Sequence, residues 1–352
     1  MKLRLGLIGL SCDWQQRHMP SLRMLADRFD VRGVYNSVSS LADRAAREFD
    51  ARSYSGFREM IASPEIDALL FLESGWFGTE PIYAACEFGK AIYCGSEVKI
   101  EPQFAEQLRE TVDNSGIAFM AEYPRRLAPA TLRLKELIAT TLGKPEILFC
   151  HHRVSSTESG HNAESGERNA VNRELVELID WCSFVAGQPV AHVHGTSHAL
   201  AKGAGEVCET PDYVALTLKF AGVSETQSEP ANQTMAQISC GSYIQDRWRE
   251  AASFRPTADL QVYCENGLAF LDLPNNLIWF DEAGRHQEML DTELPVGAQL
   301  LTQFHRAVTS LVRKMADLND VCYGLRTLQV AHQSIEKGAG IELETRRSRP
   351  SG

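Results

Sequence analysis

Apolar strands and amphipathic helices alternate through the first third of this chain. The strands are expected at 3–10, 31–35, 66–72, 91–94 and 117–121, and the helices at 17–28, 40–49, 57–62, 81–88 and 104–114. The segment 66–72 is apolar on both faces, which is typical of a central parallel strand. Alternation at this spacing predicts an α/β fold with a parallel, doubly wound sheet.

The pattern changes after about residue 123. Helices are expected at 128–140, 172–185, 298–315 and 323–337, with a strand at 146–154, a polar loop at 155–169 and further strands between 191 and 280. This order predicts an open, mostly antiparallel sheet with helices on one face. A chain of 352 residues is long enough for about two domains, which we place at residues 1–123 and 124–352.

The composition disfavours several classes of partner. The formal net charge is −11 and the one basic cluster, at 346–349, ends the chain, so nucleic acid and anionic membrane surfaces are poor partners. No apolar run reaches the roughly 18 residues that span a bilayer. The nine cysteines include no C-x-x-C pair, and a strand follows Met1 almost directly. These features predict reduced thiols, no signal peptide and a cytoplasmic location.

The first predicted strand runs into a glycine turn, GLIGLSCDW, at residues 6–14. A dinucleotide-binding turn has the spacing Gly-x-Gly-x-x-Gly, in which the second glycine admits the pyrophosphate and the third lets the helix pack close to the strand. Gly9 keeps the first position, whereas Ser11 and Trp14 stand at the second and third. We expect Trp14 to point outward or to widen the turn, because a close helix–strand contact leaves no volume for an indole. Asp13 either caps the helix or sets a negative charge where a phosphate would lie.

The order of these segments resembles the Gfo/Idh/MocA family of NAD(P)-dependent oxidoreductases over nearly the whole chain. The resemblance is carried by LRLGLIGL (3–10), SYSGFREMIASPEIDALLFL (53–72), IYAACEFGKAIYC (82–94), YPRRLAPATLRLKELI (123–138), LGKPEIL (142–148) and YGLRTLQVAHQSIEKGAGIEL (323–343). It implies a Rossmann domain followed by an open α/β sheet domain for substrate and oligomerisation. It also implies NAD or NADP as cofactor and a sugar, polyol or related hydroxyl compound as substrate.

The resemblance further implies where a cofactor would lie. Gly9, Ser11 and Cys12 correspond to the phosphate turn, and Asn36 to the acidic residue that holds the adenosine ribose. An asparagine can hydrogen-bond a ribose hydroxyl without the assistance of a charge, or simply form a turn. Glu73 begins the stretch that covers the cofactor, so that it either sets a carboxylate near the pyrophosphate or remains on the solvated rim.

The family's catalytic lysine and histidine are replaced in this chain. Ser96 stands at the lysine position and cannot act as an acid at neutral pH, while Lys99 reaches back only if the loop is rebuilt. Glu177 stands at the histidine position and Arg173 at the first aspartate, and Asp180 is kept. These three share one helical face. Glu177 either pairs with Arg173 or serves as a proton acceptor or a ligand of a sugar hydroxyl.

Further polar residues are candidates for contact with a substrate. The resemblance places the polar loop at 155–169 beside the substrate cleft, which makes candidates of His152, Arg153 and His161. Arg125 and Arg173 are further candidates for contact with a substrate. Adjacent His151 and His152 would point to opposite faces of a strand, so no metal site is expected. The resemblance also implies that the sheet of the second domain joins copies into a homo-oligomer.

Three functions remain open at this point. The first is an oxidoreductase that acts on a sugar, polyol or related compound with NAD(P), with hydride transfer that is impaired or non-standard. The second is a non-catalytic relative that no longer binds NAD(P) well and instead senses a small-molecule ligand, such as a sugar derivative, or pairs with an active subunit. The third is a non-redox enzyme that uses Glu177 and Asp180 as acid and base.

Overall fold

The computed structural model describes residues 1–153, 163–199, 212–222, 233–241, 258–291, 294–310 and 316–343. The chain forms two compact units, of which the first is Met1–Leu127 with Thr292–Tyr323 and the second is Ala128–Asp291 with Gly324–Gly352. This grouping differs from a single boundary at residue 123, because a late segment of the chain returns to the first unit.

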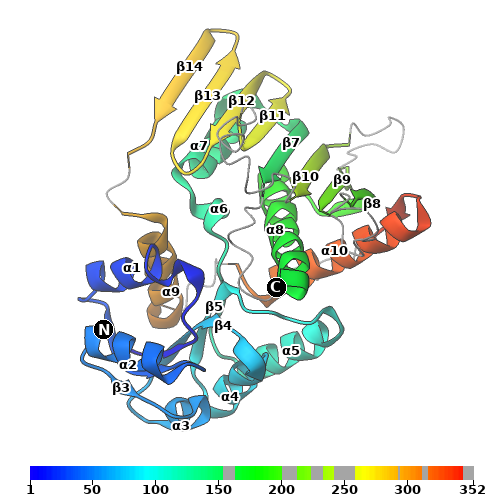
Figure 1. Ribbon diagram of the computed structural model, residues 1–352. Helices are drawn as coiled ribbons and strands as arrows, with labels where there is room; N and C mark the ends of the chain where they lie inside the picture. The colour runs from blue at the N-terminus through cyan, green and yellow to red at the C-terminus, as the bar shows by residue number, and fades with distance from the viewer. Residues whose placement is uncertain are drawn as a thin grey trace. The chain divides into compact units, whose positions relative to one another are not determined.

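The first unit is built on a parallel sheet with the strand order β3-β2-β1-β4-β5-β6 (Figure 1). Its strands are β1 (Leu3–Ile8), β2 (Phe29–Tyr35), β3 (Arg52–Ser53), β4 (Ala68–Glu73), β5 (Ala91–Glu97) and β6 (Phe119–Ala121). The predicted parallel sheet is confirmed, and the short β3 is an addition to it. From β1 the sheet grows on one side through β2 and β3, and on the other side through β4, β5 and β6. Such folds bind ligands at this switch, between β1 and β4.

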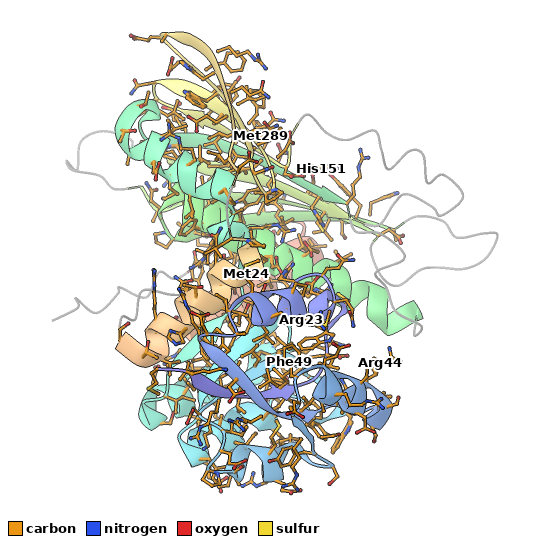
Figure 2. All side chains as sticks on the ribbon, turned by 90° about the vertical axis from the view of Figure 1, so that its left-hand side faces the viewer. Arg23, Met24, Arg44, Phe49, His151 and Met289 are labelled. Atoms are coloured by element: carbon orange, nitrogen blue, oxygen red, sulfur yellow. The ribbon has the colours of Figure 1, made fainter. Side chains whose placement is uncertain are left out.

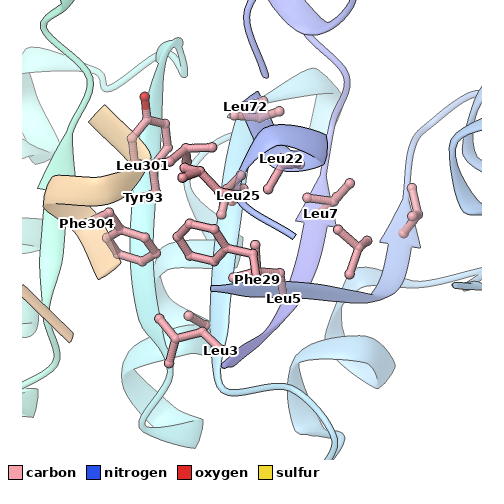
Figure 3. Packing of buried hydrophobic residues seen from close by; sticks show 14 of the residues in the cluster. Leu3, Leu5, Leu7, Leu22, Leu25, Phe29, Leu72, Tyr93, Leu301 and Phe304 are labelled. Carbon is pink, nitrogen blue, oxygen red and sulfur yellow. The ribbon is translucent and has the colours of Figure 1, made fainter. Parts of the chain in front are cut away.

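Helices connect the strands of the first unit and supply part of its core. They are η1 (Cys12–Trp14), α1 (His18–Met24), α2 (Ser39–Glu48), α3 (Phe57–Ala62), η2 (Gly75–Phe77), α4 (Glu80–Phe88), α5 (Pro102–Ser115), α6 (Pro124–Leu127) and α9 (Val296–Ser310). Helix α9 belongs to the late segment, and Figure 3 shows its Leu301 and Phe304 among the core side chains of β1, β2 and α1. The ring centroids of Phe304 and Tyr93 lie 5.8 Å apart. This apolar packing explains why the late segment joins the first unit.

Trp14 is buried, so of the two alternatives expected for its indole the outward one is wrong, and the turn makes room for it instead. The residue is 4% exposed in the same core cluster, and its ring meets that of Phe49 edge-on at 6.0 Å between centroids. The chain makes room by forming one 3-10 turn at Cys12–Trp14 and by starting α1 only at His18. The delayed helix leaves the volume that a helix starting directly at the turn would fill.

Within its described residues, the second unit has one sheet in the order β14-β13-β12-β11-β7-β10-β9-β8-β15. The strands are β7 (Pro145–Arg153), β8 (Val190–His198), β9 (Tyr213–Phe220), β10 (Met235–Gly241), β11 (Leu260–Cys264), β12 (Gly267–Asp272), β13 (Asn276–Asp281), β14 (Gly284–Met289) and β15 (Ile341–Glu342). The pair β7–β10 is parallel, and the other neighbours there are antiparallel. The predicted open, mostly antiparallel sheet is confirmed.

Helices α7 (Pro129–Leu137), α8 (Ala163–Ala186) and α10 (Leu318–Lys337) pack against this sheet, and a π-helical turn, η3 (Ile138–Leu142), extends α7 (Figure 1). Trp181 of α8 donates from Nε1 to Thr131 Oγ1 of α7 at 3.0 Å. The backbone N–H of Gly195 in β8 donates to Ser334 Oγ of α10 at 3.0 Å. None of the helices in the described part of the chain is both long and apolar enough to cross a membrane.

Two expectations for the second unit are corrected. The segment 163–169, predicted as loop, is the start of α8. Its sequence AESGERN contains the helix-favouring Ala, Glu and Arg but no apolar periodicity, which is why the pattern did not indicate a helix. Strand β14 lies beyond the last predicted strand, and its sequence GRHQEM carries no apolar alternation that would have indicated it.

Candidate functional site

The carboxyl edge of the parallel sheet in the first unit gathers most of the residues predicted to bind a cofactor. Gly9 follows β1, Asn36 follows β2, Glu73 ends β4 and Glu97 ends β5. Because these strands are parallel, the residues that end them lie at one edge of the sheet. Ligands of doubly wound sheets bind outside this edge.

Gly9 occupies a turn that glycine alone accommodates. Its φ is +71°, and its N–H donates to the carbonyl oxygen of Tyr35 at 3.0 Å. A Cβ at residue 9 would lie 2.4 Å from the carbonyl oxygen of Glu73. The glycine is therefore required by the close approach of the turn to the end of β4.

The carboxylate of Glu97 reaches this turn. Its Oε2 accepts a hydrogen bond from the backbone N–H of Cys12 at 3.2 Å, and its Oε1 accepts one from Cys12 Sγ at 2.8 Å. Cys12 opens η1, and the first N–H groups of a helical turn are donors that favour a negative charge. Next to it, Ser11 is buried, and its Oγ has no hydrogen-bond partner in the described part of the chain. The anion at this turn is thus the chain's own carboxylate.

Asn36 uses its side-chain oxygen locally. Oδ1 accepts a hydrogen bond from the backbone N–H of Val38 at 2.8 Å, and Asn36 is buried. The residue therefore forms the turn that leads into α2, which is the second of the two roles considered for it.

Glu73 stands beside Glu97 in the β4–β5 ladder. The surrounding protein atoms and then the charge of Glu97 raise the pKa of Glu73, against the opposing charge of Lys99. Two carboxylates therefore share the edge of the sheet next to the turn, and the charge of Glu97 makes the ionised form of Glu73 less favourable.

Ser96 is tied to a buried carboxylate that sequence reasoning missed. The backbone N–H of Ser96 donates to Glu122 Oε2 at 3.3 Å. Glu122 Oε1 also accepts a hydrogen bond from Arg17 Nη1 at 2.7 Å and lies 3.2 Å from His18 Nε2. Arg17 in turn pairs with Asp13 at 3.1 Å. The network joins the ends of β5 and β6 to the turn and to α1.

The charge state of Glu122 follows from these partners. Burial alone would raise the pKa of Glu122, but the charges and hydrogen bonds of His18 and Arg17 outweigh that effect and lower it to about 2. Glu122 is therefore a carboxylate at neutral pH. The sequence feature that could have indicated Glu122 is an acidic residue directly after an apolar strand, in FMAEY.

Lys99 does not take the position of Ser96, the residue that replaces the family's lysine. It lines a cavity instead. The cavity measures about 680 Å³, and its walls come from the segments after β4 and β5 together with α4 and α5. The backbone N–H of Lys99 donates to Ser74 Oγ at 3.1 Å, and Trp76, which is 80% exposed, lines the cavity with Phe104. A cavity of this size accommodates a small molecule.

In the second unit, the adjacent histidines of β7 lie on opposite faces of the sheet. His152 Nε2 lies 3.4 Å from Glu174 Oε2 of α8. His151, on the other face, places Nδ1 2.5 Å from Ser239 Oγ of β10 (Figure 2). Burial, then the charges of Arg153 and His152, lower the pKa of His151. No group of three or more His, Cys, Asp or Glu side chains suited to a metal ion occurs among the described residues.

The helix α8 carries the residues predicted for proton transfer. Glu177 and Asp180 are buried at 9% and 5% exposure, and Arg173 is half-buried. His152 contacts Glu174, which precedes Glu177 by nearly one helical turn. The structure therefore brings His152 of β7 to Glu174 of α8.

The remaining substrate candidates are divided between the units. Arg125 belongs to α6 of the first unit, and Arg153 ends β7 of the second. His161 lies outside the described residues.

Comparison with known proteins identifies relatives. Residues 3–123 match the family model GFO_IDH_MocA, described as "Oxidoreductase family, NAD-binding Rossmann fold". Inositol 2-dehydrogenase 3 of Saccharopolyspora erythraea is 26% identical over 184 residues, 51% of this chain and 54% of that protein. An inositol 2-dehydrogenase/D-chiro-inositol 3-dehydrogenase of Shouchella clausii is 25% identical over 57% of this chain and 59% of its own length. The alignments thus span a little over half the length of these relatives.

A solved structure extends the likeness in fold to both units. An oxidoreductase from Thermotoga maritima matches with a TM-score of 0.77 and 14% sequence identity, over 97% of this chain and 98% of that one. At this identity the match shows the fold alone.

Proposed function

We propose that this chain, whose residues 3–123 match the Gfo/Idh/MocA oxidoreductase family model, takes a polyol or sugar derivative and that its NAD(P)-linked hydride transfer is impaired. The names of the two inositol dehydrogenases support the class of ligand. The cavity of about 680 Å³, with a lysine, a tyrosine and a glutamine on its walls, offers polar groups that a ligand rich in hydroxyls would need.

The observation that carries the impairment is the hydrogen bond from the Cys12 N–H to Glu97. A pyrophosphate at this turn needs that N–H, and it would meet the charges of Glu97 and Glu73. Asn36 Oδ1 already accepts a hydrogen bond from the Val38 N–H, and the uncharged amide holds a ribose hydroxyl less strongly than a carboxylate would. A dinucleotide does not fit the turn with Glu97 in this position.

The groups available for proton transfer support the same proposal. The Ser96 hydroxyl is too weak an acid to replace an ammonium at neutral pH. Lys99 lies three residues further along and lines the cavity with an exposed side chain. Removal of a positioned acid or base costs about 10²–10⁴ in rate, so a redox reaction in this protein would be slow even with dinucleotide bound.

A second candidate is a non-redox enzyme that uses Glu177 and Asp180 as acid and base. Both side chains are buried on one face of α8, where two carboxyl groups can be driven to different protonation states. This function predicts that a polyol or sugar derivative is converted without any dinucleotide.

We also propose that copies of the chain associate through the open face of the second unit's sheet. The residues that carry this surface are exposed and apolar: Phe149 on β7, Tyr263 on β11, Phe280 on β13 and Met289 on β14. Their neighbours along the strands, such as Leu148 and Val262, are buried, as alternation along a strand requires. An exposed apolar face is typical of an interaction surface.

The proposed function is tested by an absorbance assay for NADH and NADPH formation over a panel of inositols, sugars and other polyols. The same compounds are titrated by calorimetry without dinucleotide. The proposal predicts binding of at least one compound and no steady formation of reduced dinucleotide. Steady turnover of any of them with NAD⁺ or NADP⁺ would contradict it, and conversion without dinucleotide would favour the non-redox candidate.

A further inference from the structure

The turn after β1 has the features of an anion site that is already filled from within. We infer that Glu97 is an internal ligand of this site. Its carboxylate occupies the place of the dinucleotide phosphate and must leave before a dinucleotide binds. The inference rests on the proposed function and names the single group that impairs dinucleotide binding.

The turn itself remains suited to an anion. Gly9 keeps the left-handed conformation that lets the backbone turn sharply after β1. Cys12 points its N–H at a carboxylate, which demonstrates that this donor is aimed at a negative charge. The Ser11 Oγ is buried beside it with no hydrogen-bond partner in the described residues, a rare situation for a buried hydroxyl. A phosphate has more acceptor oxygens than a carboxylate and could satisfy that donor as well.

The strand that carries Glu97 is itself fixed to a buried network. Glu97 ends β5, and the N–H of the preceding Ser96 is fixed by the buried Glu122. Glu122 is bound through Arg17, which also pairs with Asp13 of the turn. The same network therefore fixes both the segment that carries Glu97 and the segment that receives it.

The position of Glu97 is electrostatically unfavourable with respect to Glu73. The two residues are partners in the β4–β5 ladder, and the charge of Glu97 raises the pKa of Glu73. A carboxylate held against such repulsion can be displaced by an anion that makes more hydrogen bonds. One N–H cannot serve both anions, so Glu97 and a phosphate compete for Cys12.

The test is calorimetric titration of the full chain with NADH, NADPH and inorganic pyrophosphate. The wild type is compared with Glu97→Gln, which keeps the shape and removes the charge, and with Glu97→Ala. Glu110→Gln is the matched control, because Glu110 is exposed on α5 and its substitution changes the net charge equally. Loss of a hydrogen bond to a charged group corresponds to a change of about ten- to a hundredfold in affinity, so both Glu97 variants should bind that much more tightly. Glu110→Gln should bind like the wild type.

The alkylation rate of Cys12 provides a readout that needs no turnover. Cys12 is exposed, and its thiol donates to Glu97, whose charge opposes formation of the thiolate. Alkylation should be faster in Glu97→Gln, and pyrophosphate should protect Cys12 in that variant but not in the wild type.

The outcomes separate the two proposals. Weak binding by the wild type and equally weak binding by both Glu97 variants would overturn the internal-ligand inference, and the proposed impairment would then rest on the replacement of the family lysine by Ser96, which the absorbance assay tests separately. Tight binding and turnover by the wild type would overturn the proposed function, and Glu97 variants without gain would then overturn the inference as well.

Discussion

The carboxylate of Glu122 lies 2.7 Å from the guanidinium of Arg17, with side chains that are 1% and 26% exposed respectively. A charge removed from water to this degree is stable only with its partners in place. The pair therefore contributes to the fold of the first unit and to the order of the turn that follows β1.

Replacement of Glu122 by alanine should lower the free energy of unfolding by about 3–5 kcal/mol, because it leaves the charge of Arg17 without its buried partner. The effect is measured by urea unfolding at pH 7 with the fluorescence of the tryptophans. Glu110→Ala, on the exposed face of α5, is the control and should change the free energy by less than about 0.5 kcal/mol. Equal effects of the two substitutions would show that the network contributes nothing to stability.

The same group predicts a specific acid dependence. The pKa of Glu122 is about 2 in the folded protein, against an ordinary value of 4.5. A lowered pKa means that the ionised group stabilises the fold fully above about pH 4.5, and that this contribution is lost as the pH falls toward 2. In urea unfolding between pH 7 and pH 2, the free energy of unfolding should therefore fall less in Glu122→Gln than in the wild type, because the variant has no carboxyl group to protonate. An identical dependence of the free energy of unfolding on pH in both proteins would contradict the lowered pKa of Glu122.

Trp14 should be a core residue and Trp76 should not. Trp14→Ala is expected to lower the free energy of unfolding by about 3–5 kcal/mol, because it removes a buried indole from the cluster around α1 and α9. Trp76→Ala, at 80% exposure, is the matched control and should have little effect. Thermal unfolding of the two variants decides the matter, and a larger loss at Trp76 would reverse the interpretation of both side chains.

The open sheet face should govern self-association. Phe149→Glu combined with Tyr263→Glu should shift the protein toward monomer in sedimentation velocity, because two charges then interrupt an apolar surface. Met24→Glu, at 49% exposure on α1, is the control and should leave the sedimentation coefficient unchanged. A wild type that is already monomeric at high concentration would rule out this surface as an interface.

The sequence predicted those features that depend on local periodicity. The parallel sheet and the mostly antiparallel sheet follow from alternating segments, and β7 with its two histidines on opposite faces follows from the period of a strand. The burial of Trp14 did not follow, because it depends on a 3-10 turn that delays α1. Local patterns also could not reveal that Glu97 contacts Cys12, since 85 residues separate the two in the chain.

The most direct test of the account is a crystal structure of the protein grown with millimolar NADH. The account predicts that wherever a phosphate group lies on the turn after β1, the Glu97 carboxylate has withdrawn from the Cys12 N–H and a phosphate oxygen has replaced it. A pyrophosphate bound at this turn with the Glu97–Cys12 hydrogen bond still in place would contradict the account.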